Sequence, residues 1–392
     1  MIQTVIIGAA RTPMGAFQGR FAKLTATELG GFAIRAAIES AGIESDQIEE
    51  LLMGCVLPAG LRQAPARQAG VHAGLPDFVP ATTVNKVCGS GMKTVLMAFD
   101  HIFSGNSDFI VAGGMESMSN APYLSQSSRD GVRIGHSKLE DHMFIDGLED
   151  AFQTEKLMGH FAEECAEKYQ FTRKEQDYYA IQSLERAFLA QEKKYFSSEI
   201  TPVSLMIKGN EELIFEDEQP KLVNKEKIPF LKPAFKLGGS VTAANSSSIS
   251  DGAAALAVCS EKSAEENDIP IRARIVGYAG YAQEANWFTT APIFAVQKLL
   301  AKVGWGKDEV DLWEVNEAFA VVPMAFMRDL KISKDRLNIW GGACALGHPI
   351  GASGARILVT LLNALEYCGK KKGIATICLG GGEALAVAIE RA

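Results

Sequence analysis

Residues 109–116, FIVAGGME, and residues 374–383, IATICLGGGE, share one pattern, a short apolar run that ends in glycines followed by Glu. An apolar run of this length between turn signals is typical of a buried strand. Upstream of each run lies a helical pattern that stops at a glycine, followed by a strand. These stop glycines, Gly42 and Gly304, are 262 positions apart, and the two glycine runs are separated by nearly the same distance. The repetition predicts an α/β protein built from two duplicated halves.

Hydrophobic periodicity gives the expected elements of these halves. It predicts helices at residues 27–41, 92–103, 294–303 and 352–365, and strands at residues 4–8, 82–87, 109–112, 254–258, 311–315, 338–340 and 374–379.

A different kind of sequence separates the halves. It is richer in charge, contains two amphipathic helical patterns at residues 154–169 and 172–195, and is then broken by prolines. More than a hundred residues is too long for a structureless loop. We therefore expect a loop domain covering the active site at residues 120–242, an N-terminal half at residues 1–119 plus 243–267, and a C-terminal half at residues 268–392.

Composition excludes several classes of protein. The chain has 392 residues, of which 47% are hydrophobic and 22% charged, and its net charge of −8 argues against a nucleic-acid partner. No apolar run is long enough to span a membrane, and the start of the chain lacks the features of a secretory signal. The seven cysteines are scattered without a C-x-x-C pair, which argues against disulfides and zinc. We expect a cytoplasmic protein without a membrane partner.

Cys88 is the first candidate for chemistry, in a CGSG stretch where a predicted strand meets a predicted helix. The unpaired N–H groups at the start of a helix would lower the pKa of a thiol there and favour the thiolate. A buried cysteine with a purely structural role explains the same spacing equally well.

His348 lies in GGACALGHPIGASG, residues 341–354, a glycine-rich loop that leads into a helix. Backbone geometry would hold a histidine in such a loop, and an imidazole suits a general base because its pKa is near operating pH. The spacing of Cys344 and His348 could suggest a metal pair, but no further ligands cluster nearby. We expect no metal site.

Two further positions have both a functional and a structural interpretation. Cys378 ends a buried apolar run and could be a core cysteine, while the N–H of the following Gly380 is free to point at an oxyanion. Asn316 stands where a strand gives way to a helix, a position at which asparagine usually caps the helix.

Taken together, these segments resemble the signature blocks of the thiolases. The blocks are CGSG at residues 88–91, GGMESMS at 113–119, NEAFA at 316–320, GHPIGASG at 347–354 and CLGGG at 378–382, and the likeness extends from ARTP at residues 10–13 to the last strand. The resemblance implies a thiolase fold, in which two α/β halves form a layered αβαβα arrangement with an inserted loop domain. It also implies acyl exchange between thioesters of coenzyme A (CoA), which are substrates, with no cofactor.

The resemblance assigns a role to each candidate residue. Cys88 would be the nucleophile that takes the acyl group, and His348 would activate it and help to bind the thioester oxygen. Asn316 would hold a water that completes that oxyanion site. Cys378 would remove a proton from the second acetyl-CoA, and the backbone N–H groups of Cys88 and Gly380 would form a second oxyanion site for the acyl-enzyme. The chemistry agrees, because forming an enolate from a thioester needs both a base and oxyanion donors.

Contacts to the substrate follow from the same resemblance. Ser247 matches the serine that binds the pantetheine arm, and the residues matching the tunnel and its cover are Leu148, Met158, Phe235, Ala243, Ala318 and Phe319. The chain departs from the family pattern at three places. Ala244 and Ser248 replace glycines, a histidine is missing near residues 156–158 beside an apparent one-residue insertion, and Glu383-Ala384 stands where Met-Gly is more usual. These departures concern acyl-chain preference and CoA affinity.

DGVRIG at residues 130–135 and DGLEDAF at 146–152 resemble the short-chain type of thiolase. That type condenses two acetyl-CoA to acetoacetyl-CoA plus CoA, or runs the reverse thiolysis, and it self-associates as a dimer or tetramer through a segment near residues 126–138. The alternatives are a degradative 3-ketoacyl-CoA thiolase of broad chain length, which bulky Trp287 and Phe288 would disfavour, and a non-catalytic protein that binds CoA or lipid. A decarboxylating condensing enzyme would lack the second cysteine.

Overall fold

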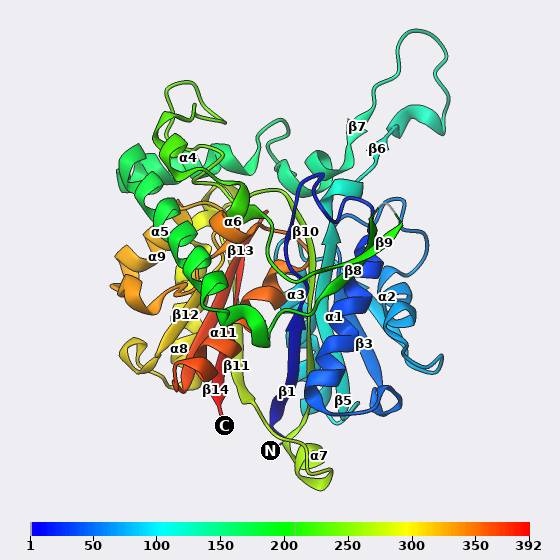
Figure 1. Ribbon diagram of the computed structural model, residues 1–392. Helices are drawn as coiled ribbons and strands as arrows, with labels where there is room; N and C mark the ends of the chain where they lie inside the picture. The colour runs from blue at the N-terminus through cyan, green and yellow to red at the C-terminus, as the bar shows by residue number, and fades with distance from the viewer. Residues whose placement is uncertain (1, 208) are drawn as a thin grey trace.

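The computed structural model describes residues 2–207 and 209–392, and its centre is one continuous sheet of ten strands. β1 (Thr4–Arg11) and β11 (Ala273–Ala282) lie side by side in the middle of this sheet, with both chain termini near their lower ends (Figure 1). Outward from β1 follow β10 (Ser250–Ser260), β5 (Phe109–Ser117), β3 (Glu50–Gly54) and β4 (Ala81–Val84); outward from β11 follow β14 (Glu383–Arg391), β13 (Lys372–Leu379) and β12 (Leu312–Val315). The short β2 (Gly15–Ala16) pairs with β10.

The two sides of the sheet repeat one another in strand sense as well as in order. On each side the two innermost pairings are antiparallel and the next is parallel. Even an irregularity is repeated, since the register shifts between Ile6 and Gly8 in β1 and between Ile275 and Gly277 in β11. The predicted duplication is therefore confirmed by the topology.

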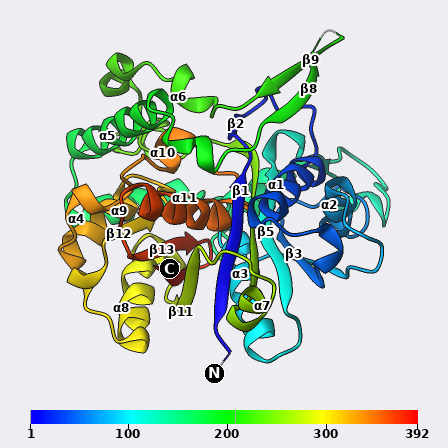
Figure 2. The ribbon, with the colours of Figure 1, turned by 60° about the horizontal axis from the view of Figure 1, so that its bottom comes forward.

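Helices complete the layers, as Figure 2 shows from below. α1 (Ala26–Ala41) and α2 (Pro65–Ala73) pack on the outer face of the N-terminal half, and α8 (Ala291–Val303) packs on the outer face of the C-terminal half beside α9 (Val321–Leu330). α3 (Ser90–Phe103) and α11 (Ser353–Tyr367) pack against each other between the two halves. Three separate apolar clusters fill the spaces between these layers. The N-terminal and C-terminal halves of the sheet are the two β layers of the predicted αβαβα arrangement, and α3 and α11 form the helical layer between them.

The helices begin and end where local chemistry dictates. Thr25 and Glu28 form a reciprocal capping box at the start of α1, a feature worth about 1 kcal/mol. α1 and α8 both end at a glycine in the left-handed region, Gly42 with φ 68° and Gly304 with φ 70°. The matched stop glycines seen in the sequence therefore end both helices in the same way, as left-handed C-cap residues.

The strand predicted at residues 338–340 is wrong. The counterpart of β4 in the C-terminal half is a single bridge between Trp313 and Leu337. Asn338 has φ 46°, which ends any strand, and its side-chain amide takes over the pairing to β12. Its Oδ1 accepts a hydrogen bond from the N–H of Val315, and its Nδ2 donates to the carbonyl of the same residue, each at 2.8 Å.

The strand predicted at residues 109–112 is too short, because the glycines that follow it do not form a turn. β5 continues through Gly113 and Gly114 to Ser117, whereas residues 380–382 do turn, between β13 and β14. Gly114 is required for close approach rather than for bending. A Cβ placed on it would lie 2.0 Å from the carbonyl oxygen of Gly351, in the loop that precedes α11.

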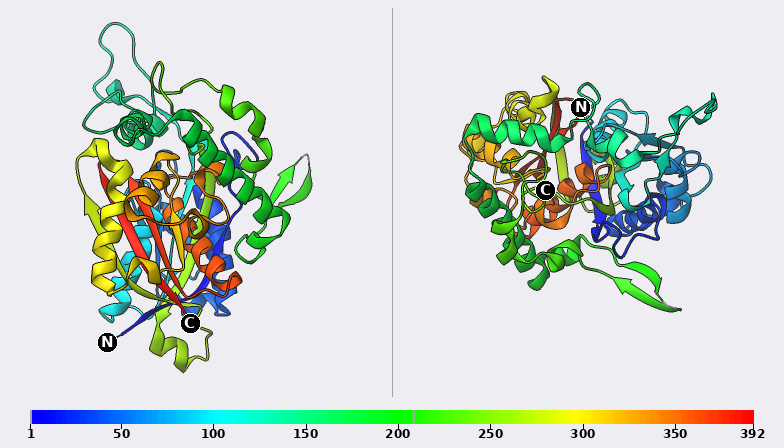
Figure 3. Two further views of the ribbon diagram at one scale, coloured as in Figure 1. Left: turned by 90° about the vertical axis from the view of Figure 1, so that its left-hand side faces the viewer. Right: turned by 90° about the horizontal axis from the view of Figure 1, so that it is seen from above.

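Residues 120–242, here called the inserted segment, extend over both halves: α4 and α5 lie over the C-terminal half, while β6–β7 and β8–β9 lie on the side of the N-terminal half (Figures 1 and 3). Its elements are β6 (Tyr123–Leu124), η3 (Gln126–Ser128), β7 (Glu140–Asp141), η4 (Phe144–Leu148), α4 (Met158–Tyr169), α5 (Arg173–Glu192), η5 (Tyr195–Ser198), β8 (Val203–Ile207), β9 (Asn210–Ile214), α6 (Gln219–Leu222) and η6 (Lys225–Phe230). α4 contacts α9 and η7 (Ala285–Thr290), and α5 contacts α10 (Ala343–Leu346). The remaining short helices are η1 (Ser45–Gln47), η2 (Met118–Asn120), α7 (Glu261–Glu266), η8 (Lys307–Glu309) and η9 (Lys334–Arg336).

A buried ion cluster fastens the inserted segment to the central strand β1. The guanidinium of Arg11 donates to Glu199 at 2.5 Å and to both oxygens of Asp217 at 2.6 and 2.9 Å, and all three side chains are fully buried. Removing one partner would leave an uncompensated buried charge, which typically costs about 3–5 kcal/mol. The cluster therefore fixes both ends of the β8–β9 hairpin against β1.

Candidate active site

Cys88 occupies a strained turn between β4 and α3. The residue before it, Val87, has φ 47°, a left-handed conformation that is unusual for a β-branched side chain and costs on the order of 1–3 kcal/mol. Hydrogen bonds hold this turn: the Val87 N–H donates to Asn85 Oδ1 at 3.0 Å, and the Ser90 hydroxyl donates to the Val87 carbonyl at 2.6 Å. Ser90 also accepts from the N–H of Lys86 at 2.8 Å. The nucleophile candidate therefore has a fixed position.

The thiol of Cys88 is a weak acid at rest. Burial raises its pKa to about 11, while hydrogen bonds from the backbone N–H groups of Gly380 and of Cys88 itself oppose that shift. The sequence-based expectation that the helix start would lower this pKa overall is wrong, because desolvation outweighs the backbone donors. A thiol of this kind needs a base beside it to become a nucleophile.

His348 has the properties of such a base. Its Nδ1 lies 2.6 Å from the hydroxyl of Ser353, which donates its own proton to the carbonyl of Pro349 at 2.9 Å. This pattern assigns the imidazole proton to Nδ1 and leaves a lone pair on Nε2. Among the residues that the structure describes, Nε2 is buried and has no hydrogen-bond partner. Burial, with a smaller contribution from the charge of Arg356, lowers the pKa of His348 to about 3, so the ring is neutral.

Asn316 follows β12 and is buried, with its backbone N–H donating to the carbonyl of Thr376 at 3.0 Å. Neither Oδ1 nor Nδ2 of its side chain finds a partner within the described ranges, 2–207 and 209–392. Buried amides almost always form hydrogen bonds in native proteins. The side chain therefore does not act as the helix cap that the sequence also allowed, and its amide is free to bind a water or a ligand.

Cys378 and Gly380 approach Cys88 from the C-terminal half. Cys378 ends β13, and burial raises the pKa of its thiol, with a further upward contribution from the charge that Cys88 would carry. The next residue, Leu379, packs against the Cys88 turn, because a Cβ on Gly89 would lie 2.3 Å from its Cδ2. Gly380 lies against the Cys88 turn, because a Cβ on it would be 3.5 Å from Cγ1 of Val87.

Close backbone approach joins the loop of His348 to the turn of Cys88. A Cβ atom placed on Gly91 would lie 2.9 Å from the carbonyl oxygen of Gly351, which is in the same loop that contacts Gly114. The buried carboxylate of Glu116 ties these parts together, accepting from the N–H groups of Val56, Leu57 and Gly351 at 3.0, 3.1 and 2.9 Å. Burial raises the pKa of Glu116 to about 7 against the effect of those donors.

The segment at residues 242–250 connects the remaining blocks. The N–H of His348 donates to the carbonyl of Ser248 at 3.0 Å, and the N–H of Ser247 donates to the carbonyl of Ala318 at 2.9 Å. Ala320 in turn donates to Asn245 at 2.8 Å. One stretch of backbone therefore sets the histidine loop against the asparagine block.

The residues expected to contact substrate gather around this centre. Met158 and Gly380 are neighbours, since a Cβ on the glycine would lie 3.7 Å from the methionine sulfur. Phe235 packs edge-on against Phe319, with ring centroids 6.0 Å apart. Leu148 packs in the same small apolar cluster as Cys88.

Ala243 lines a cavity of about 320 Å³ between α5, α6, η6 and the 242–250 segment, together with Ala244, Ser248 and Cys344. The two positions that depart from the family pattern, Ala244 and Ser248, thus face a cavity next to the site. Cavities of this size are within the range of ligand pockets.

Three supporting residues escaped the sequence analysis. Ser353 orients His348, Glu116 joins three loops, and Glu317 accepts from Tyr179, Ser183, Asn338 and the N–H of Cys344 at distances of 2.7–3.0 Å. The only signal was their place inside the signature blocks, because their partners are far away in sequence. A carboxylate beside Asn316 or at the end of β5 could have been suspected on that ground.

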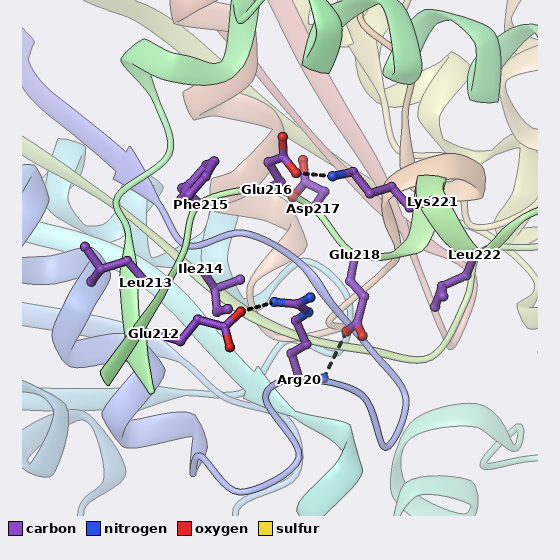
Figure 4. A pocket seen from close by; sticks show the side chains of 10 residues that line it. All are labelled: Arg20, Glu212, Leu213, Ile214, Phe215, Glu216, Asp217, Glu218, Lys221 and Leu222. Atoms are coloured by element: carbon purple, nitrogen blue, oxygen red, sulfur yellow. Dashed lines mark hydrogen bonds and ion pairs between the residues drawn. The ribbon is translucent and has the colours of Figure 1, made fainter. Parts of the chain in front are cut away.

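A separate hollow beside β9 includes none of the predicted site residues (Figure 4). Its charged side chains pair with one another, Arg20 with Glu212 and Lys221 with Glu216. Elsewhere too, no group of three or more His, Cys, Asp and Glu residues in the described parts of the chain is arranged to hold a metal ion. No helix in those parts is both long and apolar enough to cross a membrane.

Comparison with known proteins identifies the class. The family model for the thiolase N-terminal domain matches residues 4–262, and that for the thiolase C-terminal domain matches residues 269–391. The chain belongs to the thiolase family.

Particular relatives agree over the full length. The acetyl-CoA acetyltransferase of Pseudomonas aeruginosa is 46% identical and covers 100% of both chains. Acetyl-CoA acetyltransferase 2 of Arabidopsis thaliana is 48% identical, covering 98% of this chain and 96% of the relative. Among solved structures, the Acat5 thiolase of Ascaris suum in complex with coenzyme A superimposes with a TM-score of 0.95 at 40% identity, covering 100% of both chains.

Proposed function

We propose that this chain is an acetyl-CoA C-acetyltransferase of fatty acid metabolism that condenses two acetyl-CoA to acetoacetyl-CoA and CoA, or runs the reverse thiolysis. The observation that carries the proposal is the close packing of the Cys88 turn against the loop of His348 and against the end of β13, next to a neutral imidazole whose Nε2 is buried and has no partner among the described residues. Full-length relatives named acetyl-CoA acetyltransferase support the choice of substrate. Apart from the CoA thioesters, which are substrates, the proposed steps use no cofactor.

In the first half-reaction, Nε2 of His348 takes the proton of the Cys88 thiol. The sulfur attacks the carbonyl carbon of acetyl-CoA, and the carbon–sulfur bond to CoA breaks. Cys378 gives its proton to the leaving CoA sulfur and becomes a thiolate. The N–H groups of Cys88 and Gly380 hold the oxyanion that forms during this transfer, which is supported by the packing of Gly380 against Val87 in the Cys88 turn.

In the second half-reaction, the Cys378 thiolate removes an α-proton from a second acetyl-CoA. The enolate oxygen is held by Nε2–H of His348 and by a water on Asn316, for which the unpartnered amide of Asn316 is the support. The carbanion attacks the acetyl group on Cys88, and the departing sulfur of Cys88 recovers its proton from His348. Protons and bonds balance, and the enzyme returns to its starting state.

The acyl chain is short in this proposal. Phe288 is buried with its ring 6.3 Å from that of Phe319, which supports a closed end for the acyl site. Trp287 gives no such support, because its indole stacks on Lys168 at 3.9 Å instead. A broad-chain thiolase is the competing function. Turnover of a C8 3-ketoacyl-CoA at or above that of acetoacetyl-CoA would favour it.

The central test is mass spectrometry after mixing the protein with acetyl-CoA. We expect an acetyl adduct, a gain of about 42 Da, on the peptide containing Cys88 and none in the Cys88→Ala variant. A protein that only binds CoA would show no adduct, and an adduct on the variant would remove Cys88 from its proposed role.

We propose further that residues 120–242 act as the loop domain over the site and that the protein self-associates as a dimer or tetramer through residues near 126–138. Support comes from apolar side chains on the projecting β6–β7 region, where Ile134 is 87% exposed and Leu139 is 64% exposed (Figure 1). Light scattering should give a smaller assembly for Ile134→Asp.

A cytoplasmic location is proposed on the seven free thiols, which suit a reducing compartment.

A further inference from the structure

Lys86 and Glu383 form an ion pair directly across the candidate active site. The ammonium nitrogen of Lys86 lies 2.5 Å from Oε2 of Glu383, and the two side chains are 34% and 37% exposed. Lys86 is two residues before Cys88 in the N-terminal half, and Glu383 is three residues after Gly380 in the C-terminal half. The pair therefore joins the segments that carry the two backbone donors.

Both ends of the pair are built into those segments. The N–H of Lys86 donates to Ser90 Oγ, and its carbonyl accepts from the N–H of Gly89 at 3.1 Å, so its backbone is part of the Cys88 turn. Glu383 is the first residue of β14 and pairs with Leu379, the last residue of β13. A movement of either end would be transmitted to Cys88 or to Gly380.

The hairpin on the Glu383 side is held within its own half, where the carbonyl of Gly382 accepts a hydrogen bond from the N–H of Gln283 at 2.9 Å and Glu383 pairs with Ala282 of β11, and the ion pair links it to the Cys88 turn of the other half. Gly381 and Gly382 have φ values of 86° and 88°, and as glycines they carry no side chain that could anchor the turn. A Cβ on Gly380 itself would meet only Val87 and Met158, at 3.5 and 3.7 Å. The direction of the Gly380 N–H therefore depends on how the end of the hairpin is held.

We propose that the Lys86–Glu383 ion pair is a positioning device that sets the N–H of Gly380 against the N–H of Cys88, so that both can hold the oxyanion of the acyl group. The inference rests on the proposed function. It assigns a role to Glu383, one of the positions at which this chain departs from the thiolase pattern. Neither residue touches the reacting atoms.

The pair acts through geometry rather than through its charges. The two charges are opposite and partly solvated, so their combined field at the sulfur is small. The groups that shift the pKa of Cys88 are its burial, the two backbone donors and Glu116, and Lys86 is not among them. Loss of the pair should therefore slow acyl transfer without moving its pH dependence.

The experiment compares two reactions that use different oxyanion donors. Acyl transfer to Cys88 is followed by rapid quenching with acetyl-CoA and mass spectrometry. Exchange of the α-proton of acetyl-CoA in D2O is followed in a Cys88→Ala background, where His348 is free to take the proton of the Cys378 thiol so that the resulting thiolate acts as the base, and Asn316 remains. We expect Glu383→Gln to slow acyl transfer about five-fold, or about 1 kcal/mol at 1.36 kcal/mol per ten-fold, and to leave proton exchange unchanged.

Two further variants test the pairing itself. Lys86→Arg keeps the ion pair and should retain the wild-type rate, while the double variant Lys86→Glu/Glu383→Lys should recover most of the rate lost in Glu383→Gln. The matched control is Glu261→Gln, which breaks the ion pair with Arg274, also at 2.5 Å and with exposures of 25% and 38%, far from the site. It should not change either reaction.

The outcomes separate the inference from the function on which it rests. If the wild-type protein forms no acetyl adduct, the proposed function is overturned. If the wild type is acetylated and Glu383→Gln is acetylated at the same rate, only the inference is overturned. Equal slowing of acyl transfer and proton exchange would overturn it as well, because that result indicates general structural damage. No recovery in the charge-reversed variant would have the same consequence.

Discussion

Removing the hydroxyl of Ser353 should weaken His348 as a proton acceptor, although Ser353 contacts none of the reacting atoms. Ser353 is fully buried and its Oγ lies 2.6 Å from Nδ1 of His348. In Ser353→Ala the Nδ1 proton loses its acceptor, and a buried unsatisfied donor costs about 1–3 kcal/mol. The ring then gains by moving its proton to Nε2, the atom that must be free to accept the proton of Cys88.

Expressed as a barrier, 1–3 kcal/mol corresponds to acetylation slowed by about 5- to 150-fold. The assay is a single-turnover measurement of the Cys88 adduct with acetyl-CoA in excess. Ser263→Ala is the control, since Ser263 is also a buried serine near the start of a helix, bonded to Ser260 at 2.7 Å, but lies in α7 away from the site. Both variants should lose some thermal stability. Acetylation of Ser353→Ala at the wild-type rate would refute the assigned proton position.

Three other results are expected. Cys378→Ala should accumulate the acetyl adduct on Cys88 but form no acetoacetyl-CoA, and full condensation in that variant would remove Cys378 from the mechanism. The pKa of His348 is about 3 in the folded protein and about 6.5 when the chain is unfolded. Between pH 6.5 and pH 3 only the unfolded chain binds the extra proton, so the free energy of unfolding decreases as the pH is lowered. Compared with His348→Asn, the wild type should lose about 2 kcal/mol more unfolding free energy between pH 7 and pH 5 in urea titrations; equal losses would show that the imidazole is accessible to protons. Gly114→Ala should cost about 1–3 kcal/mol and slow acetylation, because its Cβ would lie 2.0 Å from the carbonyl oxygen of Gly351; an unchanged melting temperature would show that this contact is loose.

Periodicity and glycine stops were enough to predict the two halves and their layers. They failed at residues 338–340, where a side-chain amide replaces strand pairing, and at Gly114, where a glycine serves close packing instead of a turn. Both failures have the same origin. The deciding neighbour is more than twenty residues away in one case and more than two hundred in the other, and no local pattern contains it.

The candidate site shows the same division between local and distant information. The candidate catalytic residues stand out in the sequence because glycines lie next to them; they are Cys88, His348 and Cys378. Their protonation depends on burial and on partners such as Ser353, which only the fold supplies. For that reason the direction of the Cys88 pKa shift was predicted wrongly although the residue itself was not missed.

The duplication also explains how a single active site can be built from two halves that share one topology. Cys88 precedes α3 and His348 precedes α11, so nucleophile and base stand before corresponding helices of the two halves, which pack against each other. A pair of identical halves would present two nucleophiles or two bases there, and neither combination transfers a proton. Division of labour between the copies is thus built into the geometry, and a half-length fragment, however well folded, would hold only part of the chemistry.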